Sequence, residues 1–326
     1  MERPRPAGGR AEARTRIIGV FCIVGGMLFF SLNDMGIKFL SGDYALHQVV
    51  LIRTIVAMAI LLAVVMPLQG GYTGLRTRRL RVHILRGVFV VFANMLFFVA
   101  LAAMPLAEAV AISFVSPLLI TALSVLLLSE KVGPRRWLAV GFGLLGVIVI
   151  LRPGTEAFRP VAILPLLGAV AYAMVNILTR RLGGTESAVT LAFYIQITFV
   201  VVSAAMGLGV GDGRYAGTGD ASLDFLLRAW MWPEPGDWPV LAMLGIAAAI
   251  GSLLVAQGYR LCEAALAAPF EYTAMPLAVF WGVVVFGDWP DAVSWTGIAL
   301  ILAGGLYLIW RETRRGVAPE GPRARR

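Results

Sequence analysis

Ten apolar stretches, separated by short polar segments, occupy almost the whole chain. Segments such as 88–103 and 292–310 are apolar around their full circumference rather than along one stripe, so lipid or other apolar helices must surround them. About 20 apolar residues in a helix suffice to cross the hydrocarbon core of a bilayer. The pattern therefore predicts an all-α membrane protein. The expected spans are 17–39, 45–66, 82–103, 106–128, 137–151, 161–179, 188–210, 238–259, 265–286 and 292–310.

The composition agrees with this prediction. Hydrophobic residues make up 59% of the chain and charged residues only 14%, whereas about 25% of a soluble domain is charged. The first apolar run extends to about Phe39 and exceeds the roughly 7 to 15 residues of a signal-peptide core, which indicates a retained helix. The net charge of +9 comes from basic residues at helix ends. We therefore expect a lipid bilayer, and no nucleic acid, as the partner of this chain.

The distribution of basic residues predicts the orientation. Most of the 28 Lys and Arg residues lie in the terminal tails and in alternate connections, on one side of the membrane. The opposite connections contain only Arg152, Arg159, Arg214 and Arg228. By the positive-inside rule, both termini are cytoplasmic, and the expected location is the bacterial inner membrane.

The two halves of the chain resemble one another. Segment 34–42 aligns with segment 176–184, and the same alignment, continued with gaps, places Pro117 on Pro276. Each half contains five expected spans, and because five is an odd number the second copy enters the membrane from the opposite side. Two inverted halves can rock about a central site, as they do in secondary transporters.

The sequence thus predicts ten transmembrane helices arranged as two inverted five-helix repeats. The expected divisions are a basic, irregular cytoplasmic tail at 1–16, a first repeat at 17–152, a second repeat at 160–310 and a basic cytoplasmic tail at 311–326. The connection 211–237 is long, rich in Gly, Asp and Pro, and contains Trp230 and Trp232. A tolerated insertion with tryptophans at the headgroup level is favoured over an interfacial lid.

Several segments resemble the EamA family of the drug/metabolite transporter superfamily. They are LAEAVAISFVSP at 106–117, LSEKVGPRRW at 128–137 and APFEYTAMP at 268–276. The start at 31–34, with Lys38 and Arg53, is most similar to a proteobacterial branch that includes riboflavin importers. This resemblance implies a secondary carrier of small organic molecules with its site between the repeats. No nucleotide fingerprint occurs in the sequence, and no cofactor is expected.

Ionisable residues inside the spans are the first candidates for a solute site, since each costs roughly 2.5 to 3.5 kcal/mol on insertion scales. Asp34 and Lys38 are four residues apart in the first span and so lie on one helix face. They form either a structural ion pair or the lining of a cavity. Arg53 cannot lose its proton, so it must meet a carboxylate, backbone carbonyls or the solute.

The ninth span supplies a further candidate. Glu271 lies between Pro269 and Pro276, and proline-interrupted spans point to carrier sites. It is the preferred residue for a coupling proton, with a fixed ion pair to Arg53 or Arg260 as the alternative. Polar and aromatic residues at similar depth are candidates for hydrogen bonding to a planar heterocycle or stacking on it, or for helix packing. They are Asn94, Asn176, Gln257 and Tyr272.

Competing functions are weaker. The histidines His47 and His83 are far apart, and neither a nucleophile with a base nor a metal site is indicated, so the chain is not expected to be an enzyme. The favoured function is secondary transport of a small, heterocyclic or amphoteric metabolite, with riboflavin as the first candidate. An amino-acid or metabolite exporter, or a flippase for a lipid-linked headgroup, is the alternative. The glycines of 141–146 and 304–305 serve helix packing or a homodimer face.

Overall fold

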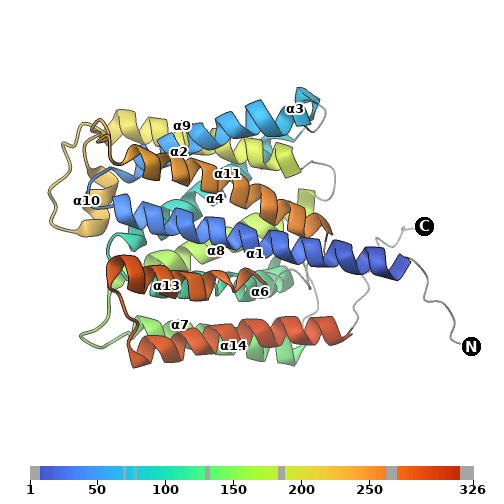
Figure 1. Cartoon of the computed structure of the whole chain (residues 1–326). Coiled ribbons are helices and arrows are strands. Elements are labelled where there is room, and N and C mark those ends of the chain that lie inside the picture. The colour runs from blue at the N-terminus through green and yellow to red at the C-terminus, as the bar shows by residue number, and fades with distance from the viewer. Residues whose placement is uncertain are drawn as a thin grey trace, which may run out of the picture.

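The computed structural model describes residues 8–68, 71–75, 77, 79–128, 133–182, 188–261 and 270–315, and all the regular elements among them are helices (Figure 1). They are α1 (Gly8–Leu40), α2 (Leu46–Ile60), the π-helical η1 (Leu61–Val65), α3 (Met66–Leu68), the 3₁₀ turn η2 (Tyr72–Leu75), α4 (Leu80–Leu101), α5 (Leu106–Ser113), α6 (Ser116–Leu128), α7 (Pro134–Leu151), η3 (Pro160–Ala162), α8 (Ile163–Leu182), α9 (Ala188–Val210), α10 (Ala221–Leu227), α11 (Trp238–Leu261), α13 (Ala274–Phe286) and α14 (Ala292–Arg315).

The helical class predicted from the apolar pattern is confirmed. Among the described residues, six helical segments are long and apolar enough to cross a membrane: Ile17–Leu40, Leu46–Leu68, Leu80–Leu101, Leu106–Leu127, Val189–Val210 and Trp238–Val255. Four shorter apolar helices, Trp137–Leu151, Pro160–Val175, Ala274–Phe286 and Ala292–Tyr307, occupy the places of the fifth, sixth, ninth and tenth expected spans. Residues 265–269, the expected start of the ninth span, lie outside the described residues.

The expected terminal tails are partly helical. α1 begins at Gly8 and α14 continues to Arg315, so residues 8–16 and 311–315 extend the first and last helices rather than forming irregular segments. These residues include Ala, Arg and Glu, which have high helix propensity. The polar composition that indicated a tail therefore does not prevent helix formation.

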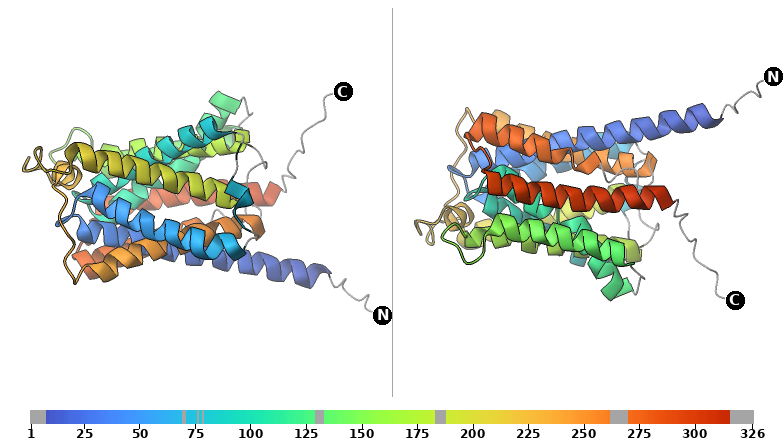
Figure 2. Two further views of the ribbon diagram at one scale, coloured as in Figure 1. Left: turned by 90° about the horizontal axis from the view of Figure 1, so that it is seen from above. Right: turned by 90° about the horizontal axis from the view of Figure 1, so that it is seen from below.

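The helices lie along a common axis (Figures 1 and 2). α1 begins and α14 ends at one end of the bundle, whereas α10 lies at the opposite end (Figure 1). We call residues 211–237, which contain α10, the strap, and the end of the bundle where they lie the strap end. The connections 41–45, 102–105, 152–159 and 287–291 are also at the strap end, as the chain direction of their flanking helices requires.

Helices from the two halves of the chain are interleaved. α1 contacts α11 and α13, while α8 contacts α4 and α6. α2 contacts α11, and α9 contacts α4. Three further pairs, α2 with α9, α5 with α13 and α7 with α14, join the halves directly. One apolar cluster, which includes Ile37, Phe98 and Leu244, runs through this arrangement.

Glycines allow α7 and α14 to approach closely. A Cβ atom on Gly146 would stand 2.7 Å from the carbonyl oxygen of Gly297, and one on Gly304 would stand 2.9 Å from that of Ala139. A Cβ atom on Gly141 would meet no atom within 4 Å. Of the two interpretations of these glycines, the structure supports helix packing inside one chain for Gly146 and Gly304.

The fourth expected span is interrupted. The sequence predicted one helix over 106–128, but α5 ends at Ser113 and α6 begins at Ser116. Pro117 lacks an N–H group and therefore cannot continue the α-helical hydrogen bonding of the preceding turn. A turn at 272–273 likewise precedes α13, close to Pro276. The rings of Phe114 and Tyr272, one at each interruption, lie 5.0 Å apart.

Candidate functional site

Asp34 and Lys38 lie on the side of α1 that faces the bundle. Ile23 is fully buried on that side, and Asp34 follows it by eleven residues, or about three helical turns. Phe21 and Phe39 are at least half exposed on the other side of the helix. Both ionisable side chains nevertheless remain partly exposed. The two side chains therefore face neighbouring helices of the bundle rather than its lipid-facing surface.

Asp34 belongs to a polar cluster that joins α1 to α2. Asn33 Nδ2 donates a hydrogen bond to Asp34 Oδ1 at 3.1 Å. The amide oxygen of the same Asn33 accepts a hydrogen bond from Arg53 at 2.9 Å. We call Asn33, Asp34 and Arg53 the α1–α2 cluster. Two of its three members are candidates from the sequence, and the structure brings them together through the third.

Arg53 occupies the most enclosed position in this cluster. Its side chain is 6% exposed, and its guanidinium carbon lies 5.3 Å from the ring centres of both Phe98 in α4 and Phe199 in α9. Such contacts stabilise a cation through the negative faces of the rings. Its Nε is buried and has no hydrogen-bond acceptor among the described residues. Arg53 donates to Asn33 and forms no ion pair with Glu271 among the described residues, while the side chain of Arg260, the other proposed partner of Glu271, lies outside them.

Lys38 lies one turn beyond Asp34, but its ion pair is elsewhere. Lys38 Nζ is 3.4 Å from Asp288 Oδ2 and donates to the carbonyl oxygens of Leu101 at 3.3 Å and Met104 at 2.7 Å. The ion pair between Asp34 and Lys38, one of the two readings of their spacing, is therefore not formed. The long lysine side chain extends toward the strap end, where the last carbonyls of α4 attract a cation.

A second polar group links the halves at the strap end. Arg152, after α7, donates to Asp291 at 2.5 Å, and Ser294 in α14 donates to Glu108 in α5 at 2.6 Å. Asp291 also accepts a hydrogen bond from the backbone N–H of Ser294, as an N-cap residue does. The hydrogen bonds from Arg152 and Ser294 lower the pKa of the Asp291 carboxyl below its ordinary value.

The strap is fastened to the ends of α1 and α2. Phe225 of α10 is fully buried in the main apolar cluster. Arg228 donates to the carbonyl oxygen of Ser41 at 3.0 Å, and Tyr44 donates to Asp237 at 2.5 Å. Burial, followed by the hydrogen bond to Asp237, raises the pKa of Tyr44.

Further contacts hold the C-terminal part of the strap. Trp230 donates its indole N–H to His47 Nδ1, and the Gln48 amide bonds to both backbone groups of Met231, at 2.5 Å and 3.3 Å. The strap is therefore fastened to the bundle between Ser222 and Asp237, whereas most of residues 212–220 are exposed. An insertion without contacts to the helices would not show this pattern.

Tyr272 and Glu271 lie beside the interruption that precedes α13. Tyr272 is 6% exposed, and its ring packs against that of Phe114 at an interplanar angle of 37°. Its hydroxyl is buried and has no hydrogen-bond partner in the part of the chain that the structure describes. A Cβ atom on Gly305 would collide with this hydroxyl, so α14 encloses it closely. Glu271 is partly buried at the same place.

The other expected site residues make different contacts or lie outside the described part of the chain. Asn94 bonds to the carbonyl oxygen of Val90 in its own helix at 2.9 Å. Gln257 is exposed. It follows the exposed Ile246 by eleven residues, or about three helical turns, so both lie on the same exposed side of α11. The side chain of Asn176 lies outside the described residues.

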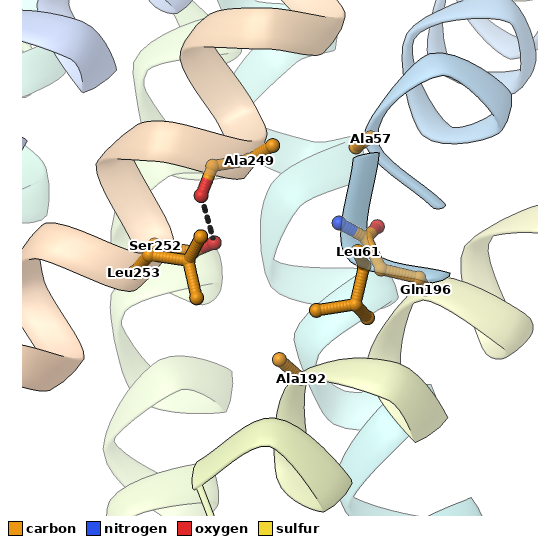
Figure 3. A pocket seen from close by; sticks show the side chains of 7 residues that line it. All are labelled: Ala57, Leu61, Ala192, Gln196, Ala249, Ser252 and Leu253. Carbon is orange, nitrogen blue, oxygen red and sulfur yellow. Dashed lines mark hydrogen bonds between the residues drawn. The ribbon is translucent and has the colours of Figure 1, made fainter. Parts of the chain in front are cut away.

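A small recess lies between α2, η1, α9 and α11, starting one turn of α2 beyond Arg53 (Figure 3). The residues that line it are Ala57, Leu61, Ala192, Gln196, Ala249, Ser252 and Leu253. Ser252 donates to the carbonyl oxygen of Ala249 at 2.9 Å, while the Gln196 amide borders the recess. Its cavity volume is only about 10 Å³, room for no more than about one water molecule, so it cannot by itself enclose a heterocyclic metabolite.

The bridging roles of two residues, Asn33 and Ser294, were not predicted from the sequence. Asn33 joins Asp34 to Arg53, and its signal was present as a second polar residue directly before Asp34 inside an apolar span. Ser294 joins Arg152 and Glu108, at 3.3 Å and 2.6 Å. A serine near the start of a helix is common, so the sequence offered no signal for that role.

Comparison with known proteins agrees with the helical arrangement. Residues 17–152 match the EamA-like transporter family. The chain is 24% identical to the S-adenosylmethionine uptake transporter of Rickettsia prowazekii over 92% of its length and 95% of the relative. It is 26% identical to the riboflavin transporter of Rhizobium johnstonii, covering 94% of this chain and 96% of that one.

A third relative is the riboflavin transporter of Vibrio cholerae, which is 27% identical over 91% of this chain and 94% of its own. The fold also resembles that of a solved crystal structure, with a TM-score of 0.62 at 21% identity, over 93% of this chain and 99% of the other. These matches identify a non-enzymatic membrane transport protein with a small-molecule substrate. The first half of the chain is thus similar to the EamA-like transporter family, and the relatives that the chain resembles over nearly its whole length include riboflavin transporters.

Proposed function

We propose that the protein is a secondary active transporter that moves a small organic metabolite across the bacterial inner membrane by alternating access. Its moving parts are two inverted five-helix repeats, residues 17–152 and 160–310. In this arrangement α1, α2, α4, the α5–α6 pair and α7 correspond to α8, α9, α11, α13 and α14. Inverted repeats of this kind allow two states of similar energy that open to opposite sides.

The observation that carries the proposal is the pattern of helix contacts. If each helix is replaced by its counterpart in the other half, the contact of α1 with α11 corresponds to that of α8 with α4. In the same way, the contact of α1 with α13 corresponds to that of α8 with α6. The contact of α2 with α11 becomes that of α9 with α4. Three pairs each consist of a helix and its own counterpart, namely α2 with α9, α5 with α13 and α7 with α14. A pseudo-twofold axis in the membrane plane produces this pattern.

The two interruptions support a site at the repeat interface. Phe114 follows α5 and Tyr272 precedes α13, so two aromatic rings in contact mark corresponding breaks in the two halves. Carrier sites are typically built where discontinuous helices of two repeats meet. We assign Glu271, partly buried beside this break, as the residue that exchanges a coupling proton.

The described conformation has its strap end closed. Lys38 with Asp288, and Arg152 with Asp291, are ion pairs that cross from the first half to the second. The distribution of basic residues supports a strap end that faces outside, with both termini in the cytoplasm. Opening to the outside therefore requires these pairs to separate and the strap to loosen or move with one half.

The α1–α2 cluster supports a heterocyclic or amphoteric solute. It offers the carboxylate of Asp34, the amide of Asn33 and the cation of Arg53, with aromatic rings at Phe98 and Phe199. Its opposite charges balance, which suits a neutral or zwitterionic molecule better than an ion of one sign. Relatives are named as transporters of riboflavin, which is a neutral heterocycle, and of S-adenosylmethionine, which carries charges of both signs with a net charge of +1.

Counterflow in proteoliposomes tests the proposal. Vesicles preloaded with unlabelled riboflavin, S-adenosylmethionine or an amino acid should transiently accumulate the matching labelled solute, as only a carrier with an alternating site does. The variants Arg53→Gln and Glu271→Gln should insert normally and lose transport. Passive equilibration without accumulation would indicate a pore, and movement of labelled lipid headgroups instead of solutes would indicate a flippase.

A further inference from the structure

Asn33 occupies a position between an acid and a base. It is 4% exposed in α1, donates through Nδ2 to Asp34 at 3.1 Å and accepts through Oδ1 from Arg53 at 2.9 Å. Both hydrogen bonds involve a charged partner, and such bonds are stronger than neutral ones. Both polar atoms of the Asn33 amide therefore have a hydrogen-bond partner.

The chemistry of the three groups determines the direction of the amide. A guanidinium can only donate and an ionised carboxylate can only accept, whereas an amide has one acceptor atom and one donor atom. The oxygen of Asn33 must therefore face Arg53 and its nitrogen must face Asp34. Neither an aspartate nor an aliphatic residue at this position can satisfy both neighbours.

This arrangement keeps Asp34 out of a direct ion pair with Arg53. The carboxylate has about four acceptor positions, and among the described residues Asn33 is its hydrogen-bond donor. Asp34 is also partly exposed on the bundle side of α1, whereas Arg53 is 6% exposed. The carboxylate-bearing residue is thus less enclosed than the residue that carries the balancing guanidinium.

We propose that Asn33 is a positioning residue: it holds Asp34 apart from Arg53, so that the carboxylate remains available to a cationic or N–H group of the solute. The solute part of this inference rests on the proposed transport function. The separation of acid and base is a property of the cluster and can be tested without a solute.

The test exchanges the two neighbouring residues by combining Asn33→Asp with Asp34→Asn (N33D/D34N). The exchanged protein has the same composition and net charge, and its new aspartate meets Arg53 directly. We expect insertion and thermal stability equal to the wild type, because Arg53 keeps an acceptor at position 33 and the new asparagine at position 34 can donate to that acceptor. Counterflow of labelled riboflavin and S-adenosylmethionine should fall at least tenfold. Wild-type counterflow in N33D/D34N would overturn the proposal, because charge balance alone would then suffice.

A second readout uses dicyclohexylcarbodiimide, an apolar reagent that modifies membrane carboxyl groups able to take up a proton. Mass spectrometry of peptides containing positions 33 and 34 should show modification of Asp34 in the wild type and little at position 33 in N33D/D34N, where Arg53 keeps the acid ionised. Glu108 and Glu271 serve as internal references. Equal modification of the two acids would overturn the assignment of Asn33. Modification as expected in a protein that transports neither solute would refute the transport function alone.

Discussion

Lys38 in α1 is paired with Asp288 beyond α13, with Nζ 3.4 Å from Oδ2, although Asp34 lies only one turn away on the same helix. The ammonium also bonds to the carbonyl oxygens of Leu101 and Met104, so that it joins three segments at the strap end. α1 and α13 belong to different halves of the chain. Any motion that separates the halves at this end must therefore break the contact between Lys38 and Asp288.

Replacement of Lys38 by Gln should make the interior more accessible from the strap end. Ser31 is 4% exposed and lies seven residues, or about 10 Å, deeper along α1. A membrane-impermeant maleimide added outside should label Ser31→Cys about fivefold faster in the Lys38→Gln background, because a partly exposed ion pair contributes about 1 kcal/mol. Both native cysteines, Cys22 and Cys262, are replaced by serine in all these proteins.

Lys38→Arg is the matched control, since it keeps the positive charge and should retain the wild-type labelling rate. Equal labelling of Ser31→Cys in the wild-type, Gln and Arg backgrounds would show that the ion pair does not restrict access. Labelling from the cytoplasmic side provides the complementary measurement, and it should not increase when Lys38 is changed.

Replacement of Gln48 by Leu should release the strap from α2. The Gln48 amide makes two hydrogen bonds with the backbone of Met231, and each is worth about 0.5 to 1.5 kcal/mol. Hydrogen exchange of the strap amides should become about tenfold faster, which corresponds to a loss of about 1.4 kcal/mol. The backbone amides of α7 are the internal control, because the packing of the strap does not depend on that helix. Unchanged exchange in residues 211–237 would show that other contacts hold the strap.

The membrane class and the positions of most helices could be predicted because apolar length is a local property of the chain. The partner of Lys38 could not, because Asp288 is 250 residues away and the four-residue spacing to Asp34 suggested a local pair instead. The break between α5 and α6 was also missed as a helix boundary, although Pro117 was noted and aligned with Pro276. A proline shows where a helix is weakened, while the surrounding packing determines whether it ends.

The candidate site was predicted in part. Asp34 and Arg53 were identified because ionisable residues are costly in apolar spans, and they do share one cluster. The bridging role of Asn33 depends on where α2 lies relative to α1, which is tertiary information. Gln257 illustrates the converse: its polarity suggested a ligand, but its side of α11 is exposed.

Replacement of Gly146 by Ala should destabilise the protein, whereas Gly141→Ala should not. A Cβ atom at 146 would stand 2.7 Å from the carbonyl oxygen of Gly297, so α7 and α14 would have to separate. Overpacking of this kind costs about 1 to 3 kcal/mol. Position 141 is open, and alanine there should be neutral or slightly stabilising. Thermal unfolding in detergent compares the two. A similar loss in both variants would indicate that residue 141 also lies in an interface.

Asp291 should contribute a small, pH-dependent part of the stability. Its pKa is lowered in the folded protein, so the contribution is complete above the unfolded value of about 4 and is lost as the pH falls through the lowered folded value. The side chain is 54% exposed, which limits the ion pair with Arg152 to about 1 kcal/mol or less. The difference in melting temperature between wild type and Asp291→Asn should therefore shrink below about pH 4.

Asp291→Ala separates the two roles of this residue. Asparagine retains the N-cap hydrogen bond to the backbone of Ser294, whereas alanine removes it at a further cost of about 1 kcal/mol. The alanine variant should therefore be less stable than the asparagine variant at every pH. Identical melting curves for the two variants would show that the cap contributes nothing.

Tyr272→Phe should leave the protein stable and impair transport. The hydroxyl of Tyr272 is buried beside the helix interruption, and the described residues offer it no hydrogen-bond partner. Removal of a buried polar group without a partner costs no stability and can increase it. In the proposed carrier the hydroxyl bonds to the solute or to its bound water, so the apparent KM for counterflow should rise severalfold while the melting temperature stays the same or increases. Phe114→Leu, which removes the stacked ring but no polar group, should lower stability instead. Wild-type KM in Tyr272→Phe would exclude the hydroxyl from the solute site.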